Sequence, residues 1–213
     1  MDAHPRLFVS KSTATPHLMT RIRDRETPRA AFRSAARRLM GILVEEALAN
    51  LPSVREVTVD TPTGTPCPGT VVDEDAVVAV SIMRAGDSMV DAVTTCIPSC
   101  PIGKILVQRN EETAQPQLMY SKMPDLTGCQ VLLLDPMLAT GGSAKSAIGV
   151  LLSKGAREED ITFVNVVACP EGIRSVFEAH PAITLVTGAV DEGLNDRSYI
   201  IPGLGDFGDR YFA

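Results

Sequence analysis

The sequence of 213 residues contains no tryptophan, and aromatic residues make up only 4% of it. Any hydrophobic core must therefore be built mainly from aliphatic side chains. Long apolar runs are also missing, since the longest, at residues 76–83, is far too short to cross a bilayer. Positive charge is not in excess. The formal net charge of −6 argues against a protein that binds nucleic acid through a basic surface.

The cysteines and the first residues of the chain indicate which covalent or metal cross-links and which compartment to expect. The five cysteines are an odd number, and Cys96 and Cys100 are separated by three residues that include Pro98, with no histidine nearby. We therefore expect neither a zinc site nor a disulfide framework. This cysteine usage indicates a reducing compartment. The first residues, MDAHPRLF, lack the apolar segment of a signal peptide, so the cytoplasm is the expected location.

Short apolar runs alternate with helical segments from residue 75 onwards. The runs cover residues 77–83, 102–107, 131–134, 161–168 and 183–186, and helical or turn segments lie near 88–96, 141–154 and 171–179. Strands that are apolar throughout and are separated by helices indicate a parallel sheet covered on both faces. With no composition break and no internal repeat, we expect an α/β fold in one domain, residues 1–213. Its ligand should lie beyond the carboxyl ends of the strands.

The residues before this region predict an arm, a helix and a hairpin. Residues 1–19 are polar and contain two prolines and two histidines, so we expect an extended arm. Thr27 as N-cap and Pro28 at the first helical position predict the start of a long amphipathic helix that ends near residue 50. Residues 54–59 alternate like a strand, and TPTGTPCPG follows at 61–69. We expect a protruding β-arm over about residues 54–75.

The stretch VLLLDPMLATGGSAKSA, residues 131–147, organises the rest of the chain. Its apolar residues form a predicted strand, Asp135 follows, and a loop of small residues at 139–143 leads into a helix. Glycine lets the backbone approach a ligand closely, and the free N–H groups of a helix start favour phosphate. Thr140 and Ser143 can add hydroxyl donors. The pattern indicates a sugar-phosphate site with Asp135 on the sugar, and an ordinary strand-to-helix turn is the alternative.

Arginines follow two of the other predicted strands. Arg84 comes directly after residues 77–83, and Arg109 comes shortly after residues 102–107. Both should lie at the sheet edge where the loop at 139–143 lies. Arginine suits multidentate contacts with phosphate, so the two are candidate phosphate ligands, although a single arginine at a strand end is commonly a solvated charge.

The carboxyl-terminal stretch YIIPGLGDFGDR, residues 199–210, contains a proline and three glycines that force an irregular backbone. Flanking apolar residues indicate a packed loop with accessible amides and carbonyls rather than a simple terminal loop. Such a loop can bind the edge of a planar ligand through the backbone. A pyrimidine needs one acceptor for N3–H and donors for O2 and O4.

These stretches resemble the uracil phosphoribosyltransferases, a family of type I phosphoribosyltransferases. The resemblance covers nearly the whole chain and rests on FRSAARRLMGILVEEAL, SIMRAGDSMVDAV, QRNEET, LLLDPMLATGGS, EGI followed by AHP, and YIIPGLGDFGDR. Pro136 stands where other phosphoribosyltransferases have a second acid, PGLGD points to uracil as the base, and FGDRYF is similar to eukaryotic members. Departures at Met83, Gln108 and the terminal Ala213 remove no identifiable ligand-contacting side chain.

The resemblance implies the type I phosphoribosyltransferase fold. This is a central parallel sheet flanked by helices, with the β-arm and a carboxyl-terminal hood that binds uracil. Within this single domain, the amino-terminal arm and the long helix comprise about residues 1–50. The β-arm comprises about residues 54–75, the core about 76–188 and the hood about 189–213.

The resemblance also implies a role for each site residue. Arg84 and Arg109 match the arginines that hold the pyrophosphate of phosphoribosyl pyrophosphate (PRPP). The loop that binds its ribose and 5′-phosphate, here called the phosphate loop, comprises Asp135, Pro136, Met137, Leu138, Ala139, Thr140, Gly141, Gly142 and Ser143. The uracil site, formed mostly by backbone groups, comprises Tyr199, Ile200, Gly205, Asp206 and Phe207. Asp206 also matches a residue on the PRPP side and would reach Mg²⁺ indirectly, so the expected catalytic residues are Arg84, Arg109 and Asp206.

The implied reaction transfers the phosphoribosyl group of PRPP to N1 of uracil, giving UMP and pyrophosphate in pyrimidine salvage, with Mg²⁺ as cofactor. The family implies a homodimer or homotetramer, and GTP is a candidate effector. Neither nucleic acid nor membrane is an expected partner. The alternative from another class is a catalytically silent or regulatory nucleotide-binding protein on the same fold.

Overall fold

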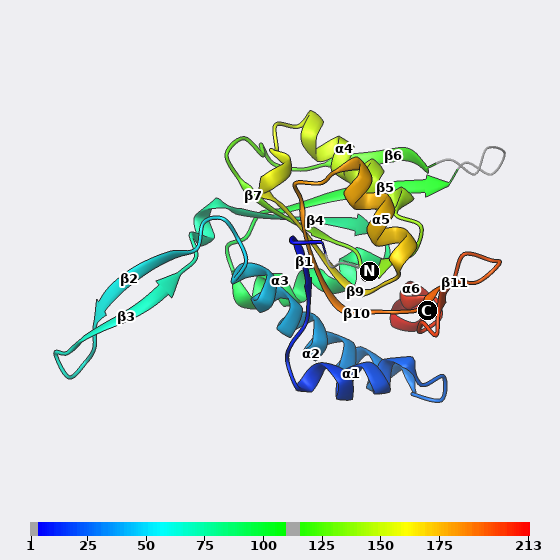
Figure 1. Ribbon diagram of the computed structural model, residues 1–213, viewed down its shortest axis with the longest axis horizontal. Coiled ribbons are helices and arrows are strands. Elements are labelled where there is room, and N and C mark those ends of the chain that lie inside the picture. Colours follow the sequence, from blue (N-terminus) through cyan, green and yellow to red (C-terminus); the bar gives the residue numbers. More distant parts are fainter. Residues whose placement is uncertain (1–3, 110–115) are drawn as a thin grey trace.

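The computed structural model describes residues 4–109 and 116–213 and contains a central sheet with helices on both faces (Figure 1). The strands follow the order β1-β10-β9-β7-β4-β5-β6, and β8 also pairs with β9. They are β1 (Leu7–Val9), β4 (Val77–Met83), β5 (Ile102–Arg109), β6 (Pro116–Lys122), β7 (Gln130–Leu134), β8 (Met137–Leu138), β9 (Ile161–Ala168) and β10 (Thr184–Val190). The predicted α/β architecture is confirmed.

The predicted central parallel sheet is confirmed, and one strand at its edge runs antiparallel. β6, which was not predicted, pairs antiparallel with β5, whereas the other neighbours are parallel. Leu118, Met119 and Tyr120 of β6 are all exposed, so this strand buries no apolar face that would reveal it in the sequence. Its place in the sheet comes from pairing of its backbone with β5.

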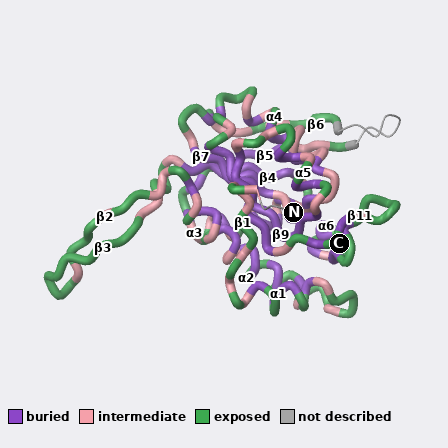
Figure 2. Tube along the Cα trace, in the orientation of Figure 1, coloured by how far each residue is buried: buried purple, intermediate pink, exposed green. Residues whose placement is uncertain are grey.

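Two hydrophobic cores, one on each face of the sheet, explain why the central strands are apolar throughout. In β4, Val77 and Ala79 pack into one core, and Val78 and Val80 pack into the other. One face is covered by α1 (Ala14–Arg23), α2 (Arg29–Leu48) and α3 (Val90–Cys96), and the other by α4 (Gly142–Ser153) and α5 (Pro170–Ala179). Figure 2 shows the resulting band of buried backbone through the centre of the molecule. The described residues also form the 3-10 turns η1 (Glu74–Ala76), η2 (Ala85–Met89) and η3 (Glu158–Asp160).

The amino-terminal segment is not the extended arm that its polar composition predicted. It forms β1, which pairs with β10, and then α1. Leu18, Met19 and Ile22 of α1 are buried in the same core as α2. Three apolar side chains on one helical face are enough to hold this segment against the domain.

The long helix was predicted correctly, but its start was not. α2 begins at Arg29, after Pro28 rather than with it, and the structure shows no side-chain capping bond at this end. The carbonyl of Pro28 accepts the N–H of Phe32 at 2.9 Å. The helix is therefore set by burial of its apolar stripe rather than by a Thr27 cap.

The predicted β-arm is present as a hairpin that projects from the sheet (Figure 1). Its strands β2 (Arg55–Asp60) and β3 (Pro66–Val71) pair antiparallel, and nearly all their residues are exposed (Figure 2). At the opposite end lies the carboxyl-terminal hood, with β11 (Gly193–Leu194), β12 (Ile200–Ile201) and α6 (Phe207–Phe212). Among the described residues, no helix combines the length and apolarity needed to cross a membrane.

Candidate active site

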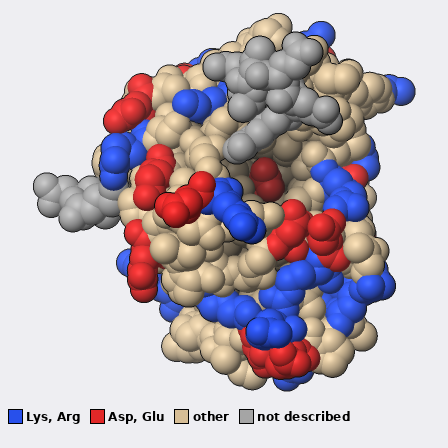
Figure 3. Space-filling model, turned by 90° about the vertical axis from the view of Figure 1, so that its right-hand side faces the viewer, with Lys and Arg blue, Asp and Glu red and all other residues tan. Residues whose placement is uncertain are grey.

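The carboxyl ends of β4, β5 and β7 lie side by side and bring the predicted site segments to one edge. β4 lies between the other two strands, with Met83 opposite Leu106 and Ser81 opposite Leu134. Arg84 directly follows β4, and Asp135 directly follows β7. Figure 3 views the side toward which these strands point. That side is hollowed at its centre and carries acidic and basic side chains around the hollow.

Arg109, the second predicted pyrophosphate ligand, is the last residue of β5. Its backbone therefore ends at the same edge as Arg84. Its side chain lies outside the described part of the chain, as do residues 110–115, which hold most of the QRNEET motif.

The phosphate loop leaves the sheet at Asp135 and returns as α4. The carbonyl of Pro136 accepts the N–H groups of Val166 at 3.1 Å and Val167 at 3.0 Å, which ties the loop to β9. Pro136 and Leu138 are buried, so their side chains hold the loop in place rather than face a ligand. Residues Met137, Ala139, Thr140, Gly142 and Ser143 are half-buried.

Two glycines allow α5 to pack directly under this loop. Gly141, which precedes α4, has φ +80°, and a Cβ there would lie 3.2 Å from the carbonyl oxygen of Gly172. A Cβ on Gly172 would lie 2.4 Å from the carbonyl oxygen of Ala139. The first N–H groups of a helix have no intrahelical acceptor, so the start of α4 offers donors for a phosphate.

Asp135 has an unusual electrostatic environment. Burial raises the pKa of this carboxyl to about 7, opposed by the N–H of Met137, which donates to Oδ1 at 3.3 Å. The backbone carbonyl of Asp135 accepts from the side-chain amide of Asn165 at 3.1 Å, and Asn165 in turn accepts from the Thr187 hydroxyl at 2.8 Å. Near neutral pH both protonation states of Asp135 are populated, so the group can accept from or donate to a sugar hydroxyl.

Arg84 presents its guanidinium at the surface of this edge. It forms an ion pair with Asp209 of α6 and lies 6.0 Å from the centre of the Phe212 ring. The side chains of Arg84 and Asp209 are 59% and 64% exposed, respectively, so an anionic ligand can reach the arginine. The sequence showed Asp209 three residues after Asp206 but gave no sign of this pairing.

The hood places the predicted uracil residues in different environments. Tyr199, Gly205 and Asp206 are exposed, whereas Ile200 is buried. The side chain of Phe207 is fully buried, with its ring 5.3 Å from that of Phe32, so contact between Phe207 and a ligand is confined to its backbone. The Asp206 carboxylate caps α6 by accepting the N–H of Asp209 at 2.8 Å.

Two arginines that the sequence analysis missed hold the hood against α1. Arg23 donates to both carboxylate oxygens of Asp191, at 2.8 and 2.5 Å. Arg210 donates to the carbonyls of Leu204 at 2.8 Å and Asp24 at 2.7 Å, and its guanidinium stacks 4.4 Å above the Phe32 ring. No local pattern signals the contacts between the hood and α1, because Arg23 and Asp191 are 168 positions apart and Arg210 and Asp24 are 186 apart.

Glu171, at the start of α5, joins this helix to the hood. Its pKa lies below the ordinary value, chiefly because its own backbone N–H donates to the carboxylate, with further donors in the Cys169 thiol and the Leu194 N–H. Leu194 belongs to β11, and a Cβ on the neighbouring Gly193 would lie 2.9 Å from Oε1 of Glu171, so α5 meets the hood at this carboxylate. The motif EGI drew attention to this residue without indicating its contact.

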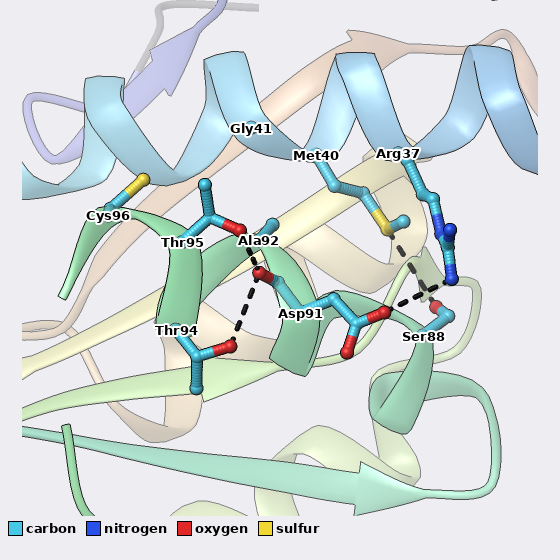
Figure 4. A pocket seen from close by; sticks show the side chains of 9 residues that line it. All are labelled: Arg37, Met40, Gly41, Ser88, Asp91, Ala92, Thr94, Thr95 and Cys96. Atoms are coloured by element: carbon cyan, nitrogen blue, oxygen red, sulfur yellow. Dashed lines mark hydrogen bonds and ion pairs between the residues drawn. The ribbon is translucent and has the colours of Figure 1, made fainter. Parts of the chain in front are cut away.

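A separate cavity of about 410 Å³ lies between α2 and α3 (Figure 4). Its polar groups largely satisfy one another: Arg37 pairs with Asp91 at 3.1 Å, and the hydroxyls of Thr94 and Thr95 donate to the Asp91 carbonyl at 3.3 and 2.7 Å. None of the predicted site residues lines it. The cavity is therefore distinct from the edge where the predicted residues gather.

Known proteins are similar to this chain over nearly its full length. The family model for uracil phosphoribosyltransferase matches residues 9–213. Uracil phosphoribosyltransferase of Dictyostelium discoideum is 50% identical over 197 residues, covering 92% of this chain and 90% of that protein. The Saccharomyces cerevisiae protein of the same name is 46% identical, with the same coverage. The solved structure of the AQ2163 protein from Aquifex aeolicus is similar with a TM-score of 0.84 and 34% identity, covering 97% of this chain and 98% of that one.

Proposed function

This chain belongs to the uracil phosphoribosyltransferase family, and from that premise we propose how its residues transfer the phosphoribosyl group of PRPP to N1 of uracil. The products are UMP and pyrophosphate. The observation that carries the proposal is that the phosphate loop and Arg84 leave neighbouring strands at one sheet edge, where the Arg84–Asp209 ion pair joins Arg84 to the hood.

PRPP would lie across the ends of β4, β5 and β7. The 5′-phosphate would accept from N–H groups at the start of α4 and from the hydroxyls of Thr140 and Ser143. Asp135 would hold a ribose hydroxyl. Arg84 and Arg109 would bind the pyrophosphate, for which the exposure of Arg84 leaves room.

Uracil would bind on the hood through the backbone of Ile200 and of residues 205–207, beside Tyr199. Fixed backbone donors and acceptors suit uracil, and cytosine would leave several of them unpaired because its N3 and C4 groups have the opposite polarity. Since the Phe207 side chain is part of the core, it would support this surface from below.

Magnesium is part of the proposal because PRPP carries clustered phosphates. Within residues 4–109 and 116–213, no three His, Cys, Asp or Glu side chains converge on a common metal site. Mg²⁺ is usually held by substrate phosphates and waters with few protein carboxylates. We therefore propose that PRPP would supply most of its ligands and that Asp206 would contact it indirectly. When bound, this ion would neutralise charge on the pyrophosphate.

The chain's own groups would act by orientation and electrostatics. As the bond from C1′ to pyrophosphate breaks, negative charge grows on the leaving group, and Arg84 and Arg109 would stabilise it. The hood would hold N1 of uracil against C1′, and this supplies proximity without a covalent intermediate. His180 pairs with Glu158 at 3.2 Å and serves the packing of α5 rather than proton transfer.

Domain organisation, assembly, regulation and location complete the proposal. We expect residues 1–213 to act as one domain and to assemble as a homodimer or homotetramer, with the β-arm as a contact. GTP is the candidate effector, neither nucleic acid nor membrane is a partner, and the cytoplasm is the site of action. Light scattering on the purified chain, with and without GTP, tests the assembly.

The experiment that tests the function is conversion of labelled uracil in the presence of PRPP and Mg²⁺. Parallel reactions contain cytosine, hypoxanthine or no metal. We expect UMP from uracil alone, and only with metal. A folded protein that binds PRPP but turns over none of these bases would favour the silent or regulatory alternative instead.

A further inference from the structure

One buried ion pair joins the amino-terminal helix to the hood. Arg23 lies at the end of α1, and its two terminal nitrogens donate to the two oxygens of Asp191 at 2.8 and 2.5 Å. The Asp191 side chain is only 4% exposed and that of Arg23 is 25% exposed. A buried pair with this forked geometry depends on both partners, because removing one leaves an uncompensated charge.

The same two side chains also hold the backbone of Gly203. Arg23 donates to the Gly203 carbonyl at 2.7 Å, and the Gly203 N–H donates to Asp191 at 2.8 Å. Gly203 has φ +60°, and a Cβ there would lie 2.1 Å from the Ile200 carbonyl oxygen. The ion pair therefore sets the position of a turn that packs directly on Ile200 and leads into Gly205.

We propose that Arg23 and Asp191 are positioning residues for uracil, so that recognition of the base depends on α1. This inference rests on the proposed function, because Ile200 and Gly205 belong to the proposed uracil site. PRPP would be held by other elements, β4 and the phosphate loop. Loosening the ion pair should therefore weaken uracil binding and base selectivity while leaving the affinity for PRPP nearly unchanged.

The test compares the wild-type chain with Arg23→Lys, which keeps the charge but loses the forked donor, and with Asp191→Asn. Both variants should raise the KM for uracil about tenfold or more, with the KM for PRPP changed less than about twofold. The preference for uracil over cytosine, as a ratio of kcat/KM, should fall in both.

The chain offers a matched control at a distance from the hood. Arg157 also donates to both oxygens of a buried aspartate, Asp160, at 2.6 and 3.1 Å, and the Asp160 side chain is 3% exposed. Arg157→Lys should lower the thermal midpoint but leave both KM values as in the wild type. An unchanged uracil KM in folded Arg23→Lys, or an equal rise in the Arg157 control, would overturn the inference.

Hydrogen exchange on the wild-type chain gives a readout that does not depend on the folding of a variant. Uracil added with pyrophosphate and Mg²⁺ should slow exchange at the end of α1 together with the hood. Protection confined to the hood would overturn the inference. If the wild type turns over no uracil at all, the proposed function itself fails, whereas normal turnover with an unaffected uracil KM removes only the role of Arg23 and Asp191.

Discussion

Replacing Asp135 by asparagine should change how the stability of the chain depends on pH. Burial raises the pKa of this carboxyl in the folded state from the ordinary value of 3.8 to about 7. Between these two values the folded state holds a proton that the unfolded state has released. The stability that protonated Asp135 contributes to the wild type is therefore fully present below pH 4 and is lost as the pH rises toward 7.

The size of this loss follows from the shift. Each tenfold change in proton affinity corresponds to about 1.4 kcal/mol, so that ionising a fully buried Asp135 would cost about 4 kcal/mol. Because Asp135 is half-buried, water screens part of this cost, and we expect a loss of about 1 to 4 kcal/mol. Asparagine does not titrate, so the variant should gain this amount relative to the wild type between pH 4 and pH 8.

The measurement is the free energy of unfolding in urea, at several pH values from 4 to 8, for the wild type and Asp135→Asn. Asp125→Asn provides a control, because hydrogen bonds from the backbone N–H and hydroxyl of Thr127 lower the pKa of Asp125 rather than raise it. The stability that this ionised carboxylate contributes is lost only as the pH falls below about 4, so the difference between wild type and Asp125→Asn should stay nearly constant from pH 4 to 8. Parallel curves for wild type and Asp135→Asn would refute the reasoning, because they would show that Asp135 titrates as it does in water.

Four further substitutions test the site. Arg84→Ala should lower kcat/KM for PRPP by about 100-fold or more with little change in the thermal midpoint, because its ion pair is largely exposed; a matching loss of stability would contradict this. Arg109→Ala should cause a similar loss of PRPP use, and near-normal activity would remove its assigned role. Gly141→Ala should destabilise the chain to urea by about 1–3 kcal/mol, since alanine is strained at φ +80°; an unchanged urea midpoint would count against it. Asp206→Asn should keep the cap of α6 and hence the thermal midpoint, but alter the dependence of activity on Mg²⁺; an unchanged dependence would exclude Asp206 from the metal side.

The parallel core was predictable because its strands are buried on both faces. β4 and β9 could be predicted without knowledge of tertiary contacts, since an apolar run of that length between helices is typical of a buried parallel strand. The exposed strand β6 and the short helix α1 were missed for the opposite reason. Their sequences are locally ambiguous, and pairing with β5 and packing against α2 decide their structure.

Sequence analysis can propose those parts of the candidate site that lie within one continuous segment. It cannot propose the parts that depend on contacts between residues far apart in the sequence. The phosphate loop combines a strand end, an acid and a helix start within a few residues, so its chemistry is visible in the sequence. Arg23 and Asp191 are 168 positions apart, and neither lies in a recognisable motif. The motif around Asp206 likewise gave no indication that Asp209 would pair with Arg84.

The most direct test of the central claim is a crystal structure of the chain with UMP. The account predicts the phosphate within hydrogen-bond distance of the N–H groups at residues 140–143, a ribose hydroxyl at Asp135, and the uracil ring against Ile200 and Gly205. UMP bound elsewhere, for example in the cavity between α2 and α3, would contradict the assignment of the sheet edge as the active site.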